Sequence, residues 1–186
     1  MPGFAYRSLQ ELAADQYGYF TTTQAREWGV TTPALVMMAK RNTVERVSHG
    51  VYRLVDYPVS PLGSYVESTL WPHGIQAVLS HETVLVLHEV SDVSPAAVHI
   101  TVPRRFRTHR AVPRRIVLHH ADLELADVEM FEGIPATTLE RAIRDCAATH
   151  LGPELVRQAI DDGQAKGLLT PAAASRLRTT LFSRQP

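Results

Sequence analysis

The spacing of apolar positions changes near residue 56 and predicts two regions of different architecture. Before that point, apolar residues recur at helical spacing between polar caps and glycines, which indicates three short helices. These helices are expected over 7–17, 24–28 and 34–41. Two runs of alternating apolar and polar residues follow, at 44–47 and 51–54, and the polar turn between them contains a glycine. This pattern is typical of a β-hairpin.

The third helix and the hairpin are the most informative stretch of the chain. Thr31 or Thr32 can cap the helix, and Pro33 suits its first turn because a missing N–H costs nothing there. Asn42 supplies a stop. A capped helix followed at once by a basic hairpin is typical of a winged helix-turn-helix domain. Its expected core consists of Leu9, Leu12, Phe20, Ala25, Trp28, Leu35, Val36, Val47, Val51 and Leu54.

Beyond residue 56 the pattern becomes a mixture of helix and strand. Two prolines without periodicity at 57–61 are typical of a linker. Further elements are expected as strands over 98–102 and 116–120, as helices over 62–70, 137–149, 153–164 and 171–181, and as a strand running into a Ser80-capped helix over 77–87. We therefore predict an α+β protein, with a winged helix-turn-helix domain over 1–56, a linker over 57–61 and a mixed α/β domain over 62–186.

Composition and charge narrow the classes of function. The 186 residues are 45% hydrophobic and 20% charged, as in an ordinary globular protein. Nineteen basic and nineteen acidic residues cancel, so a nucleic-acid surface has to arise from the distribution of charge. The single cysteine, Cys146, excludes an internal disulfide framework and a cysteine-based zinc site. Without a long apolar run or a signal-peptide layout, we expect a cytoplasmic protein with no membrane partner.

Basic residues in the helix and hairpin are the candidate DNA contacts. Between Thr31 and Arg53 the chain carries four basic residues against one acid. Such groups can bind phosphates while short polar side chains reach base edges. The candidate DNA-binding residues are Thr23, Gln24, Thr31, Thr32, Lys40, Arg41, Thr43, Arg46, His49 and Arg53. The helix middle is apolar, so Val36 or Met37 is expected to touch a thymine methyl, or the wing carries more of the contact. The alternative is a small helical domain with a solvated basic face.

A second basic segment lies between the two predicted strands of the larger domain. Its six arginines, with no acid among them, are Arg104, Arg105, Arg107, Arg110, Arg114 and Arg115. We interpret this segment as a basic hairpin that binds DNA phosphates or an acidic or phosphate-binding cleft of a partner protein. The alternative is a solvated loop. Residues 122–162 have ten acids against three arginines, which suggests an acidic surface for a protein partner or for internal pairing with the arginines.

Histidines and the cysteine do not form a recognisable catalytic or metal motif. His81 and His88 are seven residues apart, whereas a zincin helix needs its second histidine four residues after the first. Cys146 lies on the apolar stripe of its predicted helix and is expected in the core. Arg141 and Asp145 have the spacing of a helical ion pair. We expect no metal, no cofactor and no catalytic residue.

Four segments resemble a known family over nearly the whole chain. The patterns TTTQAREWGV at 21–30 and RVSHGVYRL at 46–54 are similar to the N-terminal domain of AbiEi-type antitoxins, the regulatory halves of type IV (AbiE) toxin–antitoxin systems. LSHETVLVLH at 79–88 and GIPATTLERAIRD at 133–145 resemble segments of the same family. Departures from its pattern are Val84 and Ala142, where alanine and threonine are usual.

The resemblance implies a function for each domain. The winged helix is expected to repress the antitoxin's own operon by binding an inverted repeat in double-stranded operator DNA. The C-terminal domain is expected to neutralise a cognate nucleotidyltransferase-like toxin. The protein is expected to be a monomer in solution that binds DNA cooperatively.

Two other functions remain open. One is a winged-helix-targeted nuclease-like enzyme that uses Glu67, Glu82, His119 or Asp122 around a metal. Against it, neither Lys40 nor Lys166 stands in the E-x-K pattern that a nuclease site of this kind would want. The other is a plain transcriptional repressor that answers to a small molecule.

Overall fold

The computed structural model describes residues 3–183, whose packing divides them into two compact units. Unit 1 runs as far as Ala77 and includes Glu132–Ile134, while unit 2 comprises Val78–Phe131 and the chain from Pro135 onward. Helices and strands occur in both units, which confirms the predicted α+β class. Within 3–183, no helix is both long enough and apolar enough to cross a membrane.

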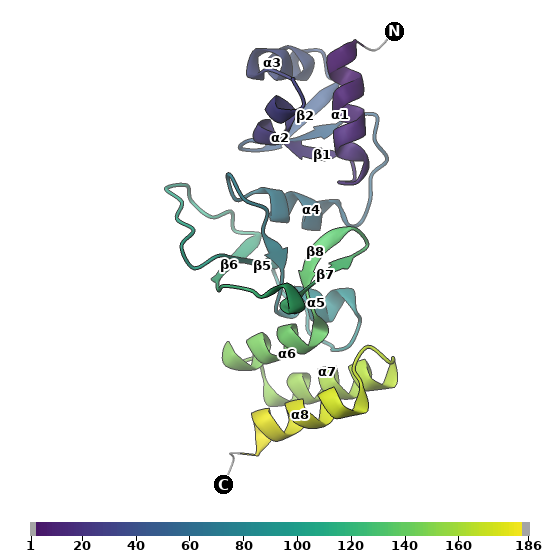
Figure 1. Cartoon of the computed structure of the whole chain (residues 1–186), viewed down its shortest axis with the longest axis vertical. Coiled ribbons are helices and arrows are strands. Elements are labelled where there is room, and N and C mark those ends of the chain that lie inside the picture. Colours follow the sequence, from purple (N-terminus) through teal and green to yellow (C-terminus); the bar gives the residue numbers. More distant parts are fainter. Residues whose placement is uncertain (1–2, 184–186) are drawn as a thin grey trace. The chain divides into compact units, whose positions relative to one another are not determined.

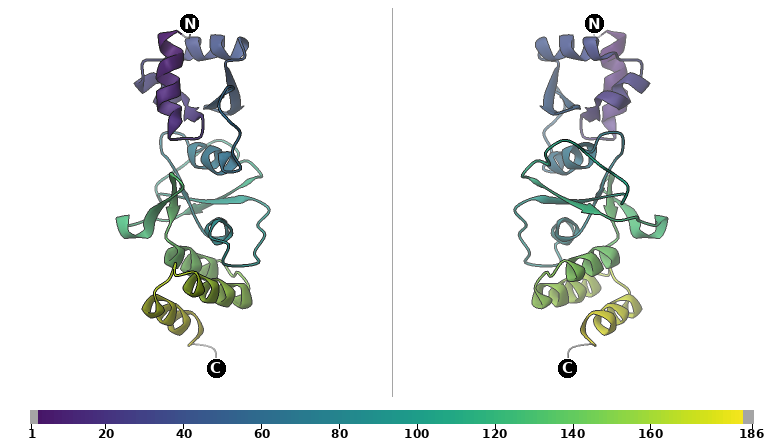
Figure 2. Two further views of the ribbon diagram at one scale, coloured as in Figure 1. Left: turned by 90° about the vertical axis from the view of Figure 1, so that its right-hand side faces the viewer. Right: turned by 90° about the vertical axis from the view of Figure 1, so that its left-hand side faces the viewer.

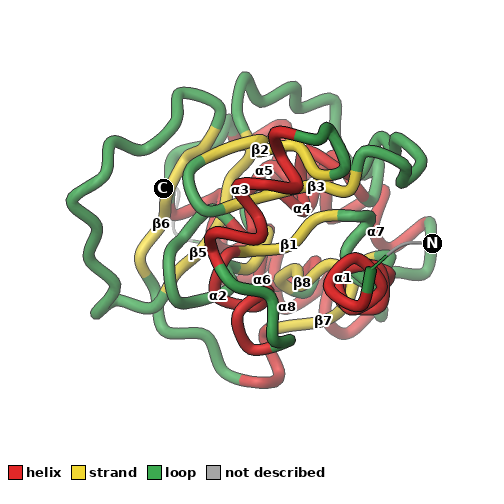
Figure 3. The backbone as a smooth tube through the Cα atoms, turned by 90° about the horizontal axis from the view of Figure 1, so that it is seen from above, coloured by secondary structure: helices red, strands yellow, loops and turns green. Residues whose placement is uncertain are grey.

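Unit 1 has the order of elements that a winged helix-turn-helix requires. Its elements are α1 (Phe4–Ala14), β1 (Tyr19–Thr21), α2 (Thr22–Glu27), α3 (Thr32–Lys40), β2 (Val44–Ser48), β3 (Val51–Leu54) and α4 (Gly63–Leu70). The three strands form an antiparallel sheet in the order β1-β3-β2, with β2 and β3 as the wing (Figure 3). Strand β1 was not predicted, because three residues are too few to show an alternating pattern.

Local capping explains where the helices of unit 1 begin and end. Thr21 caps α2 in a capping box, in which its hydroxyl accepts from the Gln24 N–H and the Gln24 side chain accepts from the Thr21 N–H. Thr31 caps α3, with its hydroxyl accepting from the Ala34 N–H at 3.4 Å. Asn42 adopts a φ of 55° directly after α3, which turns the chain into β2.

The core of unit 1 contains most of the predicted residues, but four expected members are not fully buried. One of them, Leu12, is partly buried against the core. Leu9, Phe20 and Leu35 are fully buried. Trp28 and Val36 are each 44% exposed, because Trp28 stands at the C-cap of α2 and Val36 points about 100° around α3 from Leu35. Val47 is only half-buried, since it falls at a register shift of β2 against β3, between Arg46 and Ser48.

Unit 2 combines a five-stranded mixed sheet with helices. Its elements are β4 (Val78–Leu79), α5 (Glu82–Leu87), β5 (Val98–Val102), β6 (Ile116–His120), η1 (Leu125–Asp127), β7 (Val128–Phe131), β8 (Ile134–Thr137), α6 (Leu139–Ala148), α7 (Pro153–Ala165) and α8 (Pro171–Phe182). The strand order is β6-β5-β4-β8-β7. Helices α6, α7 and α8 lie beside one another at the C-terminal end (Figures 1 and 2). Strands β7 and β8 were not predicted.

Two local predictions for unit 2 are wrong. The segment 104–115 is not a hairpin, because β5 and β6 pair in parallel, with Val98 opposite Ile116 and Val102 opposite His120. A parallel pair needs a connection that returns along the strand, which is why this loop is long. Helix α5 is capped by His81 rather than Ser80, and His81 has the unusual backbone angles φ 53° and ψ −136°.

The boundary between the two compact units lies after Ala77, beyond the predicted linker at 57–61. Helix α4 belongs to unit 1 because Gly63 lies directly against Tyr19 of β1. A Cβ at Gly63 would stand 2.8 Å from the Tyr19 hydroxyl oxygen, so a larger residue would require the Tyr19 side chain to shift. The winged-helix boundary at residue 56 remains a prediction about which segment folds alone.

The burial of Leu35 predicts the stability of unit 1. Leu35→Ala should lower the free energy of unfolding by about 2–5 kcal/mol, because it leaves a cavity under α3. Met37→Ala, on the same helix but 46% exposed, should change it by less than about 0.5 kcal/mol. Urea unfolding followed by circular dichroism measures both. Equal losses in the two variants would show that α3 does not pack through Leu35.

Candidate nucleic-acid interface

Helix α3 is buried along one side and exposes both polar and apolar side chains on the other. Leu35 is buried, whereas Thr32, Val36, Met37 and Lys40 are exposed. Val36 and Met37 are 44% and 46% exposed, which is unusual for apolar residues in a helix of this length. Exposed apolar groups between a threonine and a lysine suit a major groove, where thymine methyls offer apolar contact and phosphates line the rim.

The end of α3 leads directly into the basic wing. Lys40 and Arg41 are exposed at the last turn and C-cap of α3. On β2, the Arg46 guanidinium lies 3.2 Å from His49 Nδ1 and donates to the Ser48 carbonyl at 3.4 Å. These contacts hold Arg46 and His49 together at the turn of the wing. The arrangement offers a short run of cationic groups to a phosphate backbone.

The structure separates the ten predicted DNA-binding residues into two groups. The exposed residues are Thr31, Thr32, Lys40, Arg41, Arg46 and His49, and the half-buried ones are Thr23, Gln24, Thr43 and Arg53. Three of the half-buried residues hold the fold together. The Gln24 side chain completes the cap of α2, the Thr43 hydroxyl donates to the Met38 carbonyl at 3.0 Å, and Arg53 donates to the Tyr57 carbonyl.

The six arginines of the β5–β6 loop are spread out rather than gathered at a tip. Arg104 and Arg105 follow the carboxyl end of β5, whereas Arg114 and Arg115 precede the amino end of β6. Since the strands are parallel, these pairs flank opposite ends of a five-residue ladder about 16 Å long. Arg110 is half-buried and the other five are exposed. Figure 1 shows the loop extending outward beside β5 and β6.

Backbone contacts give part of this loop a defined shape. The Arg107 guanidinium donates to the carbonyls of Arg104 and Phe106, at 2.6 and 2.7 Å. The Arg104 N–H donates to Asp122 at 3.1 Å. The Arg104 side chain therefore remains exposed while its backbone is anchored.

A cluster of histidines in unit 2 was not predicted. His81, at the start of α5, stacks on His119 of β6 with ring centroids 3.5 Å apart. His119 Nε2 lies 3.2 Å from His99 Nδ1, and His99 Nε2 lies 3.3 Å from a Glu82 carboxylate oxygen. Ser80 accepts from Thr101 at 2.8 Å, which leaves its own hydrogen free to donate to His81 Nδ1 at 2.9 Å. The cluster depends on the β5–β6 register, which the sequence does not reveal.

Burial and mutual proximity keep these histidines neutral. Burial, followed by the neighbouring His119 and His99, lowers the pKa of His81 to about 3. Burial, followed by the nearby His99, lowers the pKa of His119 to about 4. Burial also lowers the pKa of His99, although Glu82 opposes that shift.

The histidine cluster is not arranged as a metal site. Throughout 3–183, no group of three or more His, Cys, Asp or Glu side chains is placed to hold a metal ion. The physical reason is visible in the geometry. Face-to-face stacking of His81 on His119 points their ring nitrogens sideways, and the facing nitrogens of His119 and His99 lie at hydrogen-bonding distance from each other.

The residues considered for a nuclease site are only partly brought together. Glu82 and His119 join the same cluster through His99. Glu67 is buried in α4 of unit 1, and Asp122 is exposed and accepts from the Arg104 N–H. Cys146 is fully buried on α6, and burial raises the pKa of its thiol, so it is a core residue as predicted. The predicted Arg141–Asp145 ion pair is present at 2.9 Å.

A family model matches the N-terminal part of the chain. Residues 7–55 match the family model described as "Transcriptional regulator, AbiEi antitoxin". The matched segment includes every candidate DNA-binding residue from Thr23 to Arg53.

A solved structure resembles the fold of the entire chain. The crystal structure of the RV2827C protein from Mycobacterium tuberculosis is similar with a TM-score of 0.52 and 17% sequence identity. The similarity covers 100% of this chain and 73% of that one. At this identity the likeness concerns the fold alone. No curated protein matches the chain.

The histidine cluster predicts that acid destabilises unit 2. Near pH 7 these histidines are neutral in both the folded and unfolded states. Below about pH 6.5 the unfolded chain takes up protons, whereas folded His81 and His119 resist protonation down to about pH 3 and 4. Stability should therefore fall between pH 6.5 and 4, and at pH 5 each group costs about 1–2 kcal/mol.

Urea unfolding at pH 7.5 and 5.0 measures this effect. His119→Gln should lose less stability over that interval than the unmodified chain does. His109→Gln, at an exposed position of the same unit, is the matched control and should behave like the unmodified chain. An unchanged pH dependence in His119→Gln would contradict the role of the cluster.

Proposed function

We propose that the protein is a DNA-binding antitoxin of a type IV toxin–antitoxin system. Unit 1 represses the operon by binding an inverted repeat in its operator, and unit 2 counters a nucleotidyltransferase-like toxin. The match of residues 7–55 to the AbiEi regulator family supports this proposal. The observation that carries it is the set of exposed polar and basic residues between Thr31 and His49, where a capped helix leads at once into a basic hairpin.

The exposed residues of unit 1 divide between two kinds of DNA contact. Thr32, Val36 and Met37 lie on the open face of α3, where they can meet base edges and thymine methyls. Lys40, Arg41 and Arg46 supply charge for phosphates. With so few polar groups on α3, the phosphate contacts supply most of the affinity, and binding should depend strongly on salt.

We infer that the two edges of the unit 2 sheet carry surfaces of opposite charge. Strand β6 ends the sheet on one side and is preceded by the arginine loop, while β7 ends it on the other, within the acidic segment 122–162. A basic surface suits phosphates and an acidic one suits a protein partner. We therefore assign the arginine loop to DNA and the β7 side to the toxin.

A second candidate function is a nuclease-like enzyme, and the observation that favours it is the contact chain from Glu82 through His99 to His119. A carboxylate that orients a histidine is a common part of acid–base catalysis. The test is cleavage of labelled DNA and RNA with Mg²⁺ or Mn²⁺ present. Activity that His119→Gln abolishes would favour the enzyme over the antitoxin.

Arg46→Ala should weaken binding of the chain to the inverted repeat upstream of its operon by roughly tenfold and reduce the salt slope by about one. Fluorescence anisotropy across a salt series measures both quantities. Arg7→Ala removes the same charge from an exposed position on α1 and should leave the affinity nearly unchanged. Arg53→Ala tests DNA contact less directly, because Arg53 also donates a hydrogen bond to the Tyr57 carbonyl and its loss could disturb the fold. Unaltered binding by Arg46→Ala would count against the wing assignment.

The double variant Arg104→Ala/Arg105→Ala should weaken DNA binding in the same assay, because it removes two exposed charges from the arginine loop. It should leave neutralisation intact when the chain is co-expressed with the toxin and colony growth is scored. Arg144→Ala/Arg178→Ala, which removes two exposed helical arginines of unit 2, serves as the charge-matched control. Loss of neutralisation with normal DNA binding would reassign the loop to the toxin.

A further inference from the structure

Two ring side chains lie among the arginines of the β5–β6 loop, at the carboxyl end of the ladder that β5 and β6 form. The Phe106 and His120 rings have centroids 6.5 Å apart and planes inclined by 30°. His120 is the last residue of β6 and lies opposite Val102, the last residue of β5. Phe106 is half-buried and His120 is exposed, so neither side chain is enclosed in the core.

Exposed arginines flank Phe106 in the chain. Arg104 and Arg105 precede it, and Arg107 follows it. Among residues 3–183, no acid forms an ion pair with the Arg104 or Arg105 side chain, and Asp122 accepts from the Arg104 backbone N–H instead. These two guanidinium groups are therefore available to an anionic ligand beside the rings.

Backbone contacts hold this part of the loop in one shape. The Phe106 N–H donates to the Pro103 carbonyl at 2.9 Å, which closes a turn. The Arg107 guanidinium braces that turn by donating to the carbonyls of Arg104 and Phe106 at 2.6 and 2.7 Å. A turn that is fixed before binding loses little conformational freedom when a ligand arrives.

Aromatic rings beside unpaired guanidinium groups match the chemistry of a single nucleic-acid strand. In a duplex the faces of the bases are stacked on one another, whereas unpaired bases can stack on aromatic side chains while arginines bind the phosphates. Guanidinium groups also stack on bases. The carboxylates of an acidic peptide would engage the arginines and leave the ring faces unused.

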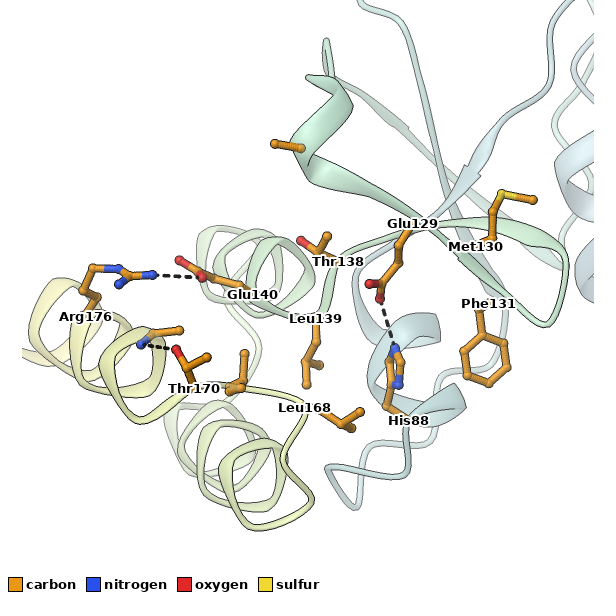
Figure 4. Close-up of a pocket in the computed structure, with 13 residues that line it drawn as sticks. His88, Glu129, Met130, Phe131, Thr138, Leu139, Glu140, Leu168, Thr170 and Arg176 are labelled. Atoms are coloured by element: carbon orange, nitrogen blue, oxygen red, sulfur yellow. Dashed lines mark hydrogen bonds and ion pairs between the residues drawn. The ribbon is translucent and has the colours of Figure 1, made fainter.

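The opposite edge of the sheet has the wrong charge for this ligand. An open pocket of about 510 Å³ lies there between β7, the end of α5, the start of α6 and the turn from α7 to α8. Figure 4 shows Glu129 pointing toward His88, 3.6 Å away, and Glu140 pairing with Arg176. Burial lowers the pKa of His88, although Glu129 opposes that shift, so His88 does not neutralise Glu129 near pH 7. Carboxylates repel phosphates, which leaves the arginine loop as the nucleic-acid side of unit 2.

We propose that the arginine loop binds a single strand of nucleic acid. The Phe106 and His120 rings stack on unpaired bases, and Arg104 and Arg105 bind the adjoining phosphates. This goes beyond operator binding, because a duplex offers phosphates to the arginines but no base faces to the rings. It does not depend on the antitoxin function of the chain.

The experiment measures fluorescence anisotropy of the full chain with labelled oligouridine and oligothymidine of about twelve nucleotides, beside the operator duplex. Phe106→Ala and His120→Ala should each weaken single-strand binding by roughly tenfold and leave duplex binding within about twofold, because they remove a stacking surface without removing an arginine. Phe106→Tyr keeps the ring and should bind like the unmodified chain. His109→Ala, at an exposed position of the same loop, is the matched control for His120→Ala.

The arginines provide a second, different signature. Arg104→Ala/Arg105→Ala should weaken binding of both the single strands and the duplex, and should lower the salt slope for the single strands by roughly one to two. Circular dichroism checks that each variant is folded. Because His120 is exposed, His120→Ala tests the rings even if Phe106→Ala fails to fold.

The outcomes separate this inference from the proposed function. Equal weakening of single-strand and duplex binding in the ring variants, or no binding of either oligonucleotide by the unmodified chain, would refute single-strand recognition while operator binding stands. Loss of operator binding with single-strand binding retained would instead refute the proposed function. If the inference holds, tighter binding of oligouridine identifies RNA as the ligand, and tighter binding of oligothymidine identifies single-stranded DNA.

Discussion

Parallel pairing of β5 with β6 is the constraint on which the surfaces of unit 2 depend. Because both strands run in one direction, the chain must travel back along the ladder between them, and the returning loop carries the arginines. The same register puts His99 and His119 on one face, since His99 lies opposite Val117 and side chains alternate along a strand. An antiparallel hairpin of the same residues would have gathered the arginines at a tip.

The order of strands in the sheet of unit 2 separates basic from acidic segments, although the chain as a whole has no net charge. Equal numbers of acidic and basic residues give no net charge, yet the arginine loop adjoins one edge strand, β6, while the other edge strand, β7, lies in the acid-rich segment 122–162. Some acids of this segment already form ion pairs within unit 2, as Asp127 and Asp145 do with Arg141. Glu129 lies 3.6 Å from His88, whereas Glu140 pairs with Arg176 at 3.3 Å.

Unit 1 depends on a different constraint, the capping of short helices. Helices of six and nine residues are marginal by themselves, so the hydroxyls of Thr21 and Thr31 and the core contact of Leu35 supply what intrinsic propensity does not. Gln24 illustrates the consequence for function. A residue that resembles a DNA contact in the sequence is engaged in the capping box, and the exposed groups available to DNA begin at Thr31.

The sequence by itself determined what depends on neighbouring residues. The cap and stop of α3, the β2–β3 hairpin and the place of Cys146 on the inward stripe of α6 all follow from local spacing. Capping and helical periodicity act over a few residues, so they can be recognised in the sequence without knowledge of the fold.

Only the tertiary structure decided which distant segments meet. It set β5 parallel to β6, formed the short strands β1, β7 and β8, stacked His81 on His119 and formed the pocket beside Glu129. It also exposed Trp28 and Val36, whose apolar character had suggested a place in the core. Strand pairing joins residues far apart in the chain, and its register and direction depend on packing that no short window of sequence contains.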